Sequence, residues 1–104
     1  MSQVDRQQVA LYTIKNSQET PFWDGGVKPF LVHHLDVIDG SYWEGEIGTP
    51  NPSYSDVLEI IMFKQYSEDN QALDFTLPGN VTDYVIRVEF SQTDEVLNIS
   101  TLAN

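Results

Sequence analysis

The 104-residue sequence predicts a mainly β fold, a single-domain antiparallel sandwich or barrel-like sheet of about seven short strands. Apolar and polar residues alternate strictly over residues 84–90 and again over 73–77, as expected for strands whose side chains point to opposite faces. Between them, Pro78-Gly79-Asn80 is a turn signal that makes the two segments neighbouring antiparallel strands. Gly and Pro also separate the other short apolar segments.

The remaining strands are expected on either side of this hairpin. Three are predicted in the first half of the chain, at residues 9–14, 30–38 and 41–47. A last strand is expected near residues 96–100. One short helix at the N-terminus has some support, because Ser2 and Asp5 have the spacing of a capping box without its usual glutamate. No repeat or linker divides residues 1–104, so one domain is predicted.

Residues 56–66 fit two patterns. As a strand, Leu58, Ile60 and Met62 share a face, and the polar residues 67–71 become a hairpin loop into the next strand. As a helix, the same segment would form an apolar stripe that Ser53 or Ser55 could cap. We favour the strand and leave the helix open. The expected core consists of Leu11, Leu31, Trp43, Ile60, Met62, Phe75, Ile86, Val88 and Phe90.

The charge departs most from an average domain: 16 Asp and Glu against 5 Lys and Arg give a formal net charge of −11. The five cations are scattered, which argues against direct binding of nucleic acid or an anionic membrane. The sequence has no cysteine, no signal peptide pattern and no apolar segment long enough to span a bilayer. We therefore expect a cytoplasmic protein whose acidity either attracts a basic partner or only maintains solubility.

The candidate binding surface is the segment 40–52, which places aromatic rings and carboxylates between glycines and prolines. On a strand, Tyr42, Glu44 and Glu46 would share the solvent face while Trp43 and Ile47 face the core. Nearby acids and a loop tryptophan would extend the surface. The expected partner-binding residues are Tyr42, Glu44, Glu46, Asp36, Asp39, Trp23 and Asp24. A solvated sheet face without a partner is the equally weighted alternative.

The candidate catalytic and metal-binding residues do not have the arrangement that these chemistries require. Glu44 and Glu46 have roughly the separation of an inverting glycosidase pair, but they would point the same way instead of flanking a sugar. His33 and His34 are adjacent and would face opposite sides of a strand, so they cannot share a metal ion there; one of them is expected to be buried and hydrogen-bonded. No serine-nucleophile or phosphate-loop motif occurs. We predict no enzyme activity, no cofactor and no metal.

In size, acidity, lack of cysteine and lack of catalytic motifs, the chain resembles the small immunity proteins of bacterial polymorphic-toxin and contact-dependent growth inhibition systems. The resemblance implies an inhibitor that neutralises a cognate basic toxin domain, expected to be a nuclease, by covering its active site or substrate groove. Two alternatives stay open. One is a phage-type inhibitor that mimics nucleic acid, and the other is a non-catalytic β-sandwich module with a structural or carbohydrate-binding role.

Overall fold

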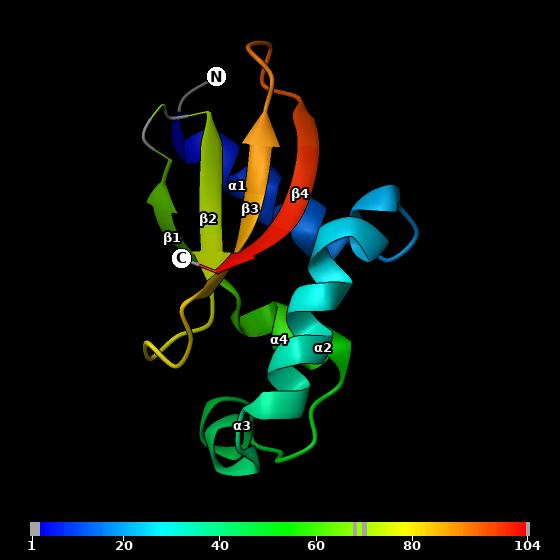
Figure 1. Ribbon diagram of the computed structural model, residues 1–104, viewed down its shortest axis with the longest axis vertical. Coiled ribbons are helices and arrows are strands. Elements are labelled where there is room, and N and C mark those ends of the chain that lie inside the picture. Colours follow the sequence, from blue (N-terminus) through cyan, green and yellow to red (C-terminus); the bar gives the residue numbers. More distant parts are fainter. Residues whose placement is uncertain (1–2, 68, 70, 104) are drawn as a thin grey trace.

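The computed structural model describes residues 3–67, 69 and 71–103, and it combines helices with one antiparallel sheet (Figure 1). The helices are α1 (Gln3–Lys15), the π-helical turn η1 (Trp23–Val27), α2 (Lys28–Val37), α3 (Gly40–Ile47) and α4 (Tyr54–Ile60). The strands are β1 (Met62–Tyr66), β2 (Ala72–Thr76), β3 (Tyr84–Phe90) and β4 (Val96–Ala103). The prediction of a mainly β protein is therefore wrong: helices cover more of the described residues than strands do.

The three strands expected in the first half are all helical. Residues 9–14 lie in α1, residues 30–38 lie in α2 and its C-cap, and residues 41–47 lie in α3. Each helix turns a stripe of side chains inward at a spacing of four residues, which is the helical period and not the strand period. These inward pairs are Ala10 with Ile14, Phe30 with His34, and Trp43 with the partly buried Ile47.

Local capping explains where the short helices begin and end. Gly48 follows α3 with φ at +96°, the left-handed conformation that glycine adopts at low cost, and its N–H donates to the carbonyl of Glu44. Ser53 and Asp56 form a capping box at the start of α4, so the helical alternative is confirmed for the first half of residues 56–66. The backbone becomes extended at Ile61, and only Met62–Tyr66 forms the expected strand.

The four strands form a meander in the order β1-β2-β3-β4, with every neighbouring pair antiparallel. The predicted hairpin around residues 78–80 is confirmed, and Gly79 and Asn80 both have positive φ there. Irregularities interrupt the register of β1 beside Lys64 and that of β3 at Phe90. The loop expected over residues 67–71 joins β1 to β2, although residues 68 and 70 lie outside the described part.

One face of the sheet carries the core. Figure 1 shows α1 crossing behind the strands, and the buried residues of α1 and α2 join those of β2, β3 and β4 in one apolar cluster. Six of the nine expected core residues are buried, while Leu11 and Ile60 are partly buried. Met62 was expected inside but is 47% exposed, because β1 is an edge strand and Met62 lies on its outer face.

Helices α2, α3 and α4 extend the molecule away from the sheet, and the whole molecule measures 41 × 27 × 21 Å. η1 packs beside the edge strand β4, where Thr101 Oγ1 donates to the carbonyl of Gly26 at 2.5 Å. From there α2 leads toward α3, which lies at the end of the molecule farthest from the upper edge of the sheet (Figure 1). This arrangement separates a sheet end from a helical end.

Candidate functional site

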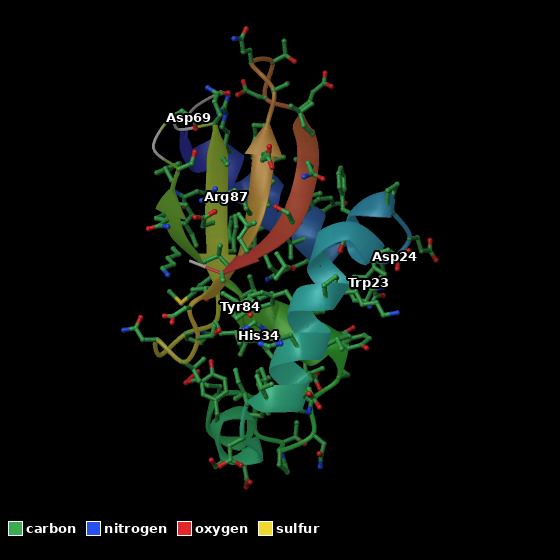
Figure 2. The ribbon with its side chains drawn as sticks, in the orientation of Figure 1. Trp23, Asp24, His34, Asp69, Tyr84 and Arg87 are labelled. Carbon is green, nitrogen blue, oxygen red and sulfur yellow. The ribbon has the colours of Figure 1, made fainter. Side chains whose placement is uncertain are left out.

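Four of the seven predicted binding residues lie together in sequence at the helical end and are exposed. Asp36 is near the C-terminus of α2, Asp39 is the N-cap of α3, and Glu44 and Glu46 are on α3. We call these four residues the acidic end. Trp23 and Asp24 are at the opposite end of α2, a separation of about 15 Å along a ten-residue helix (Figure 2). The structure therefore does not bring all seven residues together.

The predicted arrangement of α3 is also corrected. Because the segment is helical, Tyr42 and Glu46 lie one turn apart on the same side, whereas Glu44 is rotated by roughly 200° from Tyr42. The expected inward position of Trp43 is confirmed, since it is 1% exposed. Glu44 and Glu46 are both exposed without forming a row along one face.

Tyr42 has a structural contact that the sequence did not indicate. Its hydroxyl donates to the carbonyl of Pro78 at 2.7 Å, and its ring meets that of Trp43 edge to face at 5.0 Å. Burial raises the pKa of Tyr42 to about 12, and the nearby Glu46 carboxylate adds to that rise. Tyr42 thus stays neutral and fastens α3 to the loop between β2 and β3.

Charge compensation distinguishes the acidic end from the rest of the molecule. No Lys or Arg occurs between Lys28 and Lys64. That segment carries six acids, namely Asp36, Asp39, Glu44, Glu46, Asp56 and Glu59. Among the described residues, ion pairs join Arg6 to Asp94, Arg87 to Asp74 and Lys15 to Glu59, and of these only the pair from Lys15 to Glu59, at 3.7 Å, involves an acid of this segment. The acidic end is therefore a source of uncompensated negative potential.

A groove lies beside the acidic end. We call it the α2–α3 groove; it has a volume of about 370 Å³ and is lined by Leu35, Ile38, Gly40, Trp43, Pro50, Asn51 and Pro52. The loop after α3 forms its outer wall and comes close to the helix, since a Cβ on Gly40 would lie 3.2 Å from Pro50. The buried indole Nε1 of Trp43 has no hydrogen-bond partner within the described residues. Such a volume falls in the range of ligand sites, about 300 to 1,000 Å³.

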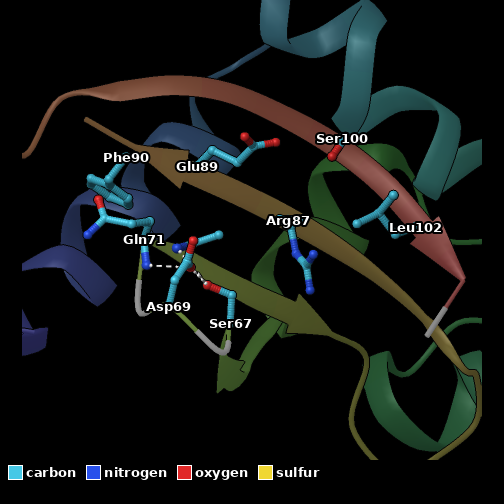
Figure 3. A pocket seen from close by; sticks show the side chains of 9 residues that line it. Ser67, Asp69, Gln71, Arg87, Glu89, Phe90, Ser100 and Leu102 are labelled. Atoms are coloured by element: carbon cyan, nitrogen blue, oxygen red, sulfur yellow. Dashed lines mark hydrogen bonds between the residues drawn. The ribbon is translucent and has the colours of Figure 1, made fainter. Parts of the chain in front are cut away.

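The open face of the sheet offers a second polar site, centred on Arg87 (Figure 3). Its Nε and Nη2 donate to the two carboxylate oxygens of Asp74 at 2.8 and 3.0 Å, and Gln65 donates to the same carboxylate at 3.1 Å. Burial raises the pKa of Asp74, but the hydrogen bonds from Arg87 and Gln65 outweigh it and hold this pKa below its ordinary value. The site is internally neutralised.

A depression of about 280 Å³ adjoins Arg87 on this face. Asp69 and Glu89 both line it, and their charges further raise the pKa of Arg87 after the dominant hydrogen bond to Asp74. Asp69 is itself engaged, since it accepts hydrogen bonds from the Ser67 hydroxyl and the Gln71 N–H. With a cation already among its acids, this depression attracts a charged ligand less strongly than the acidic end does.

His34 is the buried, hydrogen-bonded histidine that was expected (Figure 2). Its Nδ1 lies 2.6 Å from the carbonyl of Phe30, which can only accept, so Nδ1 carries the proton. Its Nε2 then accepts from the hydroxyl of Thr82 at 2.8 Å. Burial lowers the pKa of His34, the bond to Phe30 opposes this shift, and the charge of His33 adds to it.

Two of these features were not predicted from the sequence. The Asp74–Arg87 pair depends on the exact register of the hairpin, because a turn centred on residues 78–80 would place Asp74 opposite residue 84, whereas the observed loop over residues 77–83 places it opposite Arg87. The α2–α3 groove had no signal in a strand interpretation, since it exists only where two helices and a proline-containing loop meet.

No group of three or more His, Asp or Glu side chains in the described part of the chain is placed to hold a metal ion. Among the same residues, no helix is both long and apolar enough to cross a bilayer. Searches against protein-family models, curated proteins and solved structures found no match to this chain.

Proposed function

We propose that this chain is a non-enzymatic acidic inhibitor with the role of an immunity protein. It binds a basic toxin domain, expected to be a nuclease, and covers its active site or substrate groove. The observation that carries the proposal is the acidic end, where four exposed carboxylates lie in a segment without any Lys or Arg. A basic partner would supply the cations that the chain itself does not place there, and complementary fields speed encounter by roughly 10- to 1,000-fold.

The structure gives less support to the two alternatives. A sugar-binding platform needs open aromatic faces, but Trp43 is 1% exposed and Trp23 is partly buried against Tyr54, with ring centroids 5.5 Å apart. A strand over residues 41–47 would have spaced Glu44 and Glu46 like successive phosphates, which would suit nucleic-acid mimicry and the groove of a nuclease alike. That spacing is lost because residues 40–47 form α3.

The test is protection of growth. Where the gene immediately upstream encodes a large secreted protein, the C-terminal domain of that protein is the toxin to test, expressed in a bacterial host with and without this chain. Protection by the wild-type chain is expected. The acidic-end variant, Asp36→Asn, Asp39→Asn, Glu44→Gln and Glu46→Gln, should bind the toxin domain at least about tenfold more weakly, since each exposed pair contributes up to about 1 kcal/mol.

A matched control removes four exposed acids elsewhere: Glu19→Gln, Asp83→Asn, Glu89→Gln and Glu95→Gln. Both variants lose the same charge, so a difference between them reports location and not net charge. Circular dichroism of each variant verifies that the fold is intact. If the wild-type chain gives no protection, the proposed function is contradicted; if both variants bind equally well, the acidic end is not the docking surface.

A further inference from the structure

The α2–α3 groove contains a hydrogen-bond donor that the described part of the chain does not satisfy. Trp43 lines the groove and is 1% exposed, and its buried indole Nε1–H has no partner among the described residues. An unpaired donor in a buried position destabilises a fold, and native structures rarely retain one. Because an indole N–H can only donate, the missing partner is an acceptor.

The walls of the groove require the rest of an occupant to be apolar. Leu35 and Ile38 supply aliphatic surface at the end of α2, and Pro50 and Pro52 supply it on the opposite loop. Ligand sites in proteins commonly combine such apolar walls with a few polar groups that fix the orientation of the ligand. The groove therefore suits an aliphatic group that carries a hydrogen-bond acceptor close to it.

The charge of the surrounding segment requires that acceptor to be neutral. Six acids and no Lys or Arg occur between Lys28 and Lys64, so a carboxylate or a phosphate would be repelled there. A peptide carbonyl accepts equally well without a net charge. The exposed Asn51 at the groove also favours a peptide, because its side-chain amide can donate to a backbone carbonyl and accept from a backbone N–H.

We infer that the α2–α3 groove binds a short apolar peptide segment of the basic partner. One aliphatic side chain of that segment packs against Leu35 and Ile38, and an adjoining backbone carbonyl accepts a hydrogen bond from the Trp43 Nε1–H. This inference rests on the proposed function, because it gives the same partner a second, apolar contact in addition to the acidic end.

The loop over residues 49–52, which forms the outer wall, gives the carbonyl access to the buried indole. Within the described part of the chain, the hydrogen bond made by this loop runs from the Asn51 N–H to the Thr49 hydroxyl at 3.3 Å and stays inside the loop. Pro50 and Pro52 have no N–H to donate. The loop can therefore move outward without breaking a hydrogen bond to α2 or α3.

The two tryptophans allow the groove to be followed by nuclear magnetic resonance of the full chain. The probe is N-acetyl-leucine N-methylamide, which has neutral carbonyls and an aliphatic side chain. Its glycine analogue lacks the side chain, and N-acetyl-leucine has a carboxylate in place of the second amide. The measurement records the two indole N–H signals, and Trp23→Phe assigns them.

We expect the leucine amide to move the Trp43 indole proton downfield, because a new hydrogen bond deshields it. The shift should saturate with a dissociation constant of about 1 mM, as ordinary ligand efficiency gives for a compound of this size. The glycine compound should bind at least about tenfold more weakly, because it buries no aliphatic side chain. N-acetyl-leucine should bind at least about threefold more weakly, because its carboxylate is repelled.

Matched variants separate the groove from the rest of α2. Leu35→Ala should weaken binding of the leucine amide, and of the toxin domain, at least about fivefold. The control is Val32→Ala on the same helix, since Val32 is 45% exposed and does not line the groove; it should bind as the wild type does. Circular dichroism verifies that each variant is folded.

The donor itself is tested by Trp43→Phe, which keeps an aromatic ring but removes the N–H. Binding of the leucine amide, followed through backbone amide signals, should weaken about two- to tenfold. Should this variant fail to fold, the downfield shift of the wild-type indole proton tests the same hydrogen bond.

Four results would overturn the inference. They are no saturable shift at about 50 mM, far above the expected dissociation constant; equal binding of the leucine and glycine compounds; binding that leaves the Trp43 indole signal unmoved; and an indole N–H held by an internal water that the leucine amide does not displace.

Failure of the proposed function gives a different pattern. In that case the leucine amide binds and Leu35→Ala weakens it, yet the chain does not protect against the toxin. If the chain protects while the groove ignores the leucine amide, only the present inference fails.

Discussion

Single residues that are both buried and polar tie separate parts of this molecule together. Asp74 is buried on the open face of the sheet, where Arg87 and Gln65 satisfy its carboxylate from both neighbouring strands. His34 is buried in α2, and its hydrogen bond with the Thr82 hydroxyl joins this helix to the loop before β3. Because an unpaired buried polar group is costly, each of these contacts has a larger effect on stability than its single hydrogen bonds imply.

Replacing Arg87 should destabilise the fold substantially. Arg87→Met leaves the Asp74 carboxylate, whose side chain is 0% exposed, with Gln65 as its remaining side-chain donor among the described residues. A loss of about 2 to 4 kcal/mol in the free energy of unfolding is expected, measured by urea denaturation. The control is Lys15→Met, which removes the ion pair to the 74% exposed Glu59 and should cost less than about 0.5 kcal/mol. Equal losses would contradict this account.

His34 should make the fold sensitive to mild acid. Because its folded pKa lies below the ordinary value of 6.5, the unfolded chain binds the proton first as the pH falls. The stabilisation is complete well above pH 6.5 and declines as the pH drops from there toward the folded pKa, by at most about 1.4 kcal/mol per pH unit. The measurement compares unfolding free energies at pH 7 and pH 5 for the wild type and His34→Gln.

The His34→Gln variant shows whether this histidine or the carboxylates cause the loss of stability between pH 7 and pH 5. The variant should be less stable at pH 7 and should lose less stability on going to pH 5. Asp74 acts in a lower range, because a carboxylate whose folded pKa is depressed loses its contribution only as the pH falls below its ordinary value near 4. An unchanged slope between pH 7 and pH 5 in the variant would rule His34 out as the cause.

The π-helical turn η1 and strand β4 approach each other closely at Gly26. A Cβ on Gly26 would overlap the carbonyl of Ile99, which belongs to the backbone and cannot move aside, whereas Gly25 has open space around it. Gly26→Ala should therefore destabilise the fold by at least about 2 kcal/mol. Gly25→Ala, in the same helical turn, should be neutral or stabilising by up to about 1 kcal/mol. Thermal unfolding of both variants tests the contrast.

Strands β2 and β3 could be predicted from the sequence, whereas helices α2 and α3 could not, and the difference has physical reasons. β2 and β3 were recognised because Leu73 and Phe75 alternate with polar positions and a glycine turn joins the strands. The helices α2 and α3 were missed because they are short and carry aromatic residues, which are also frequent in strands. The acidic residues of the candidate site were named correctly as exposed groups, but their spatial arrangement depends on α3 and could not be obtained from a strand pattern.

For the whole molecule, the net charge of −11 should oppose folding at low ionic strength. Compact folding raises the density of negative charge over residues 36–59, where only the ion pair from Lys15 to Glu59 offsets it among the described residues, and salt screens the remaining repulsion. The unfolding temperature should rise by about 3 to 8 °C between roughly 0.02 and 0.5 M sodium chloride, equivalent to about 1 kcal/mol. The acidic-end variant should show a smaller rise than the wild type, and no rise in either would contradict the repulsion.

The two borders of the sheet set a limit on how copies of this chain can associate. β1 is short, and its register is interrupted beside Lys64, while η1 packs against β4 through Gly26 and Thr101. Irregular edges, lysine side chains and covering segments all prevent another chain from adding a strand. We therefore expect neither border of the sheet to template fibrils, even at high protein concentration, and contacts with other chains to be made by side chains on the surface.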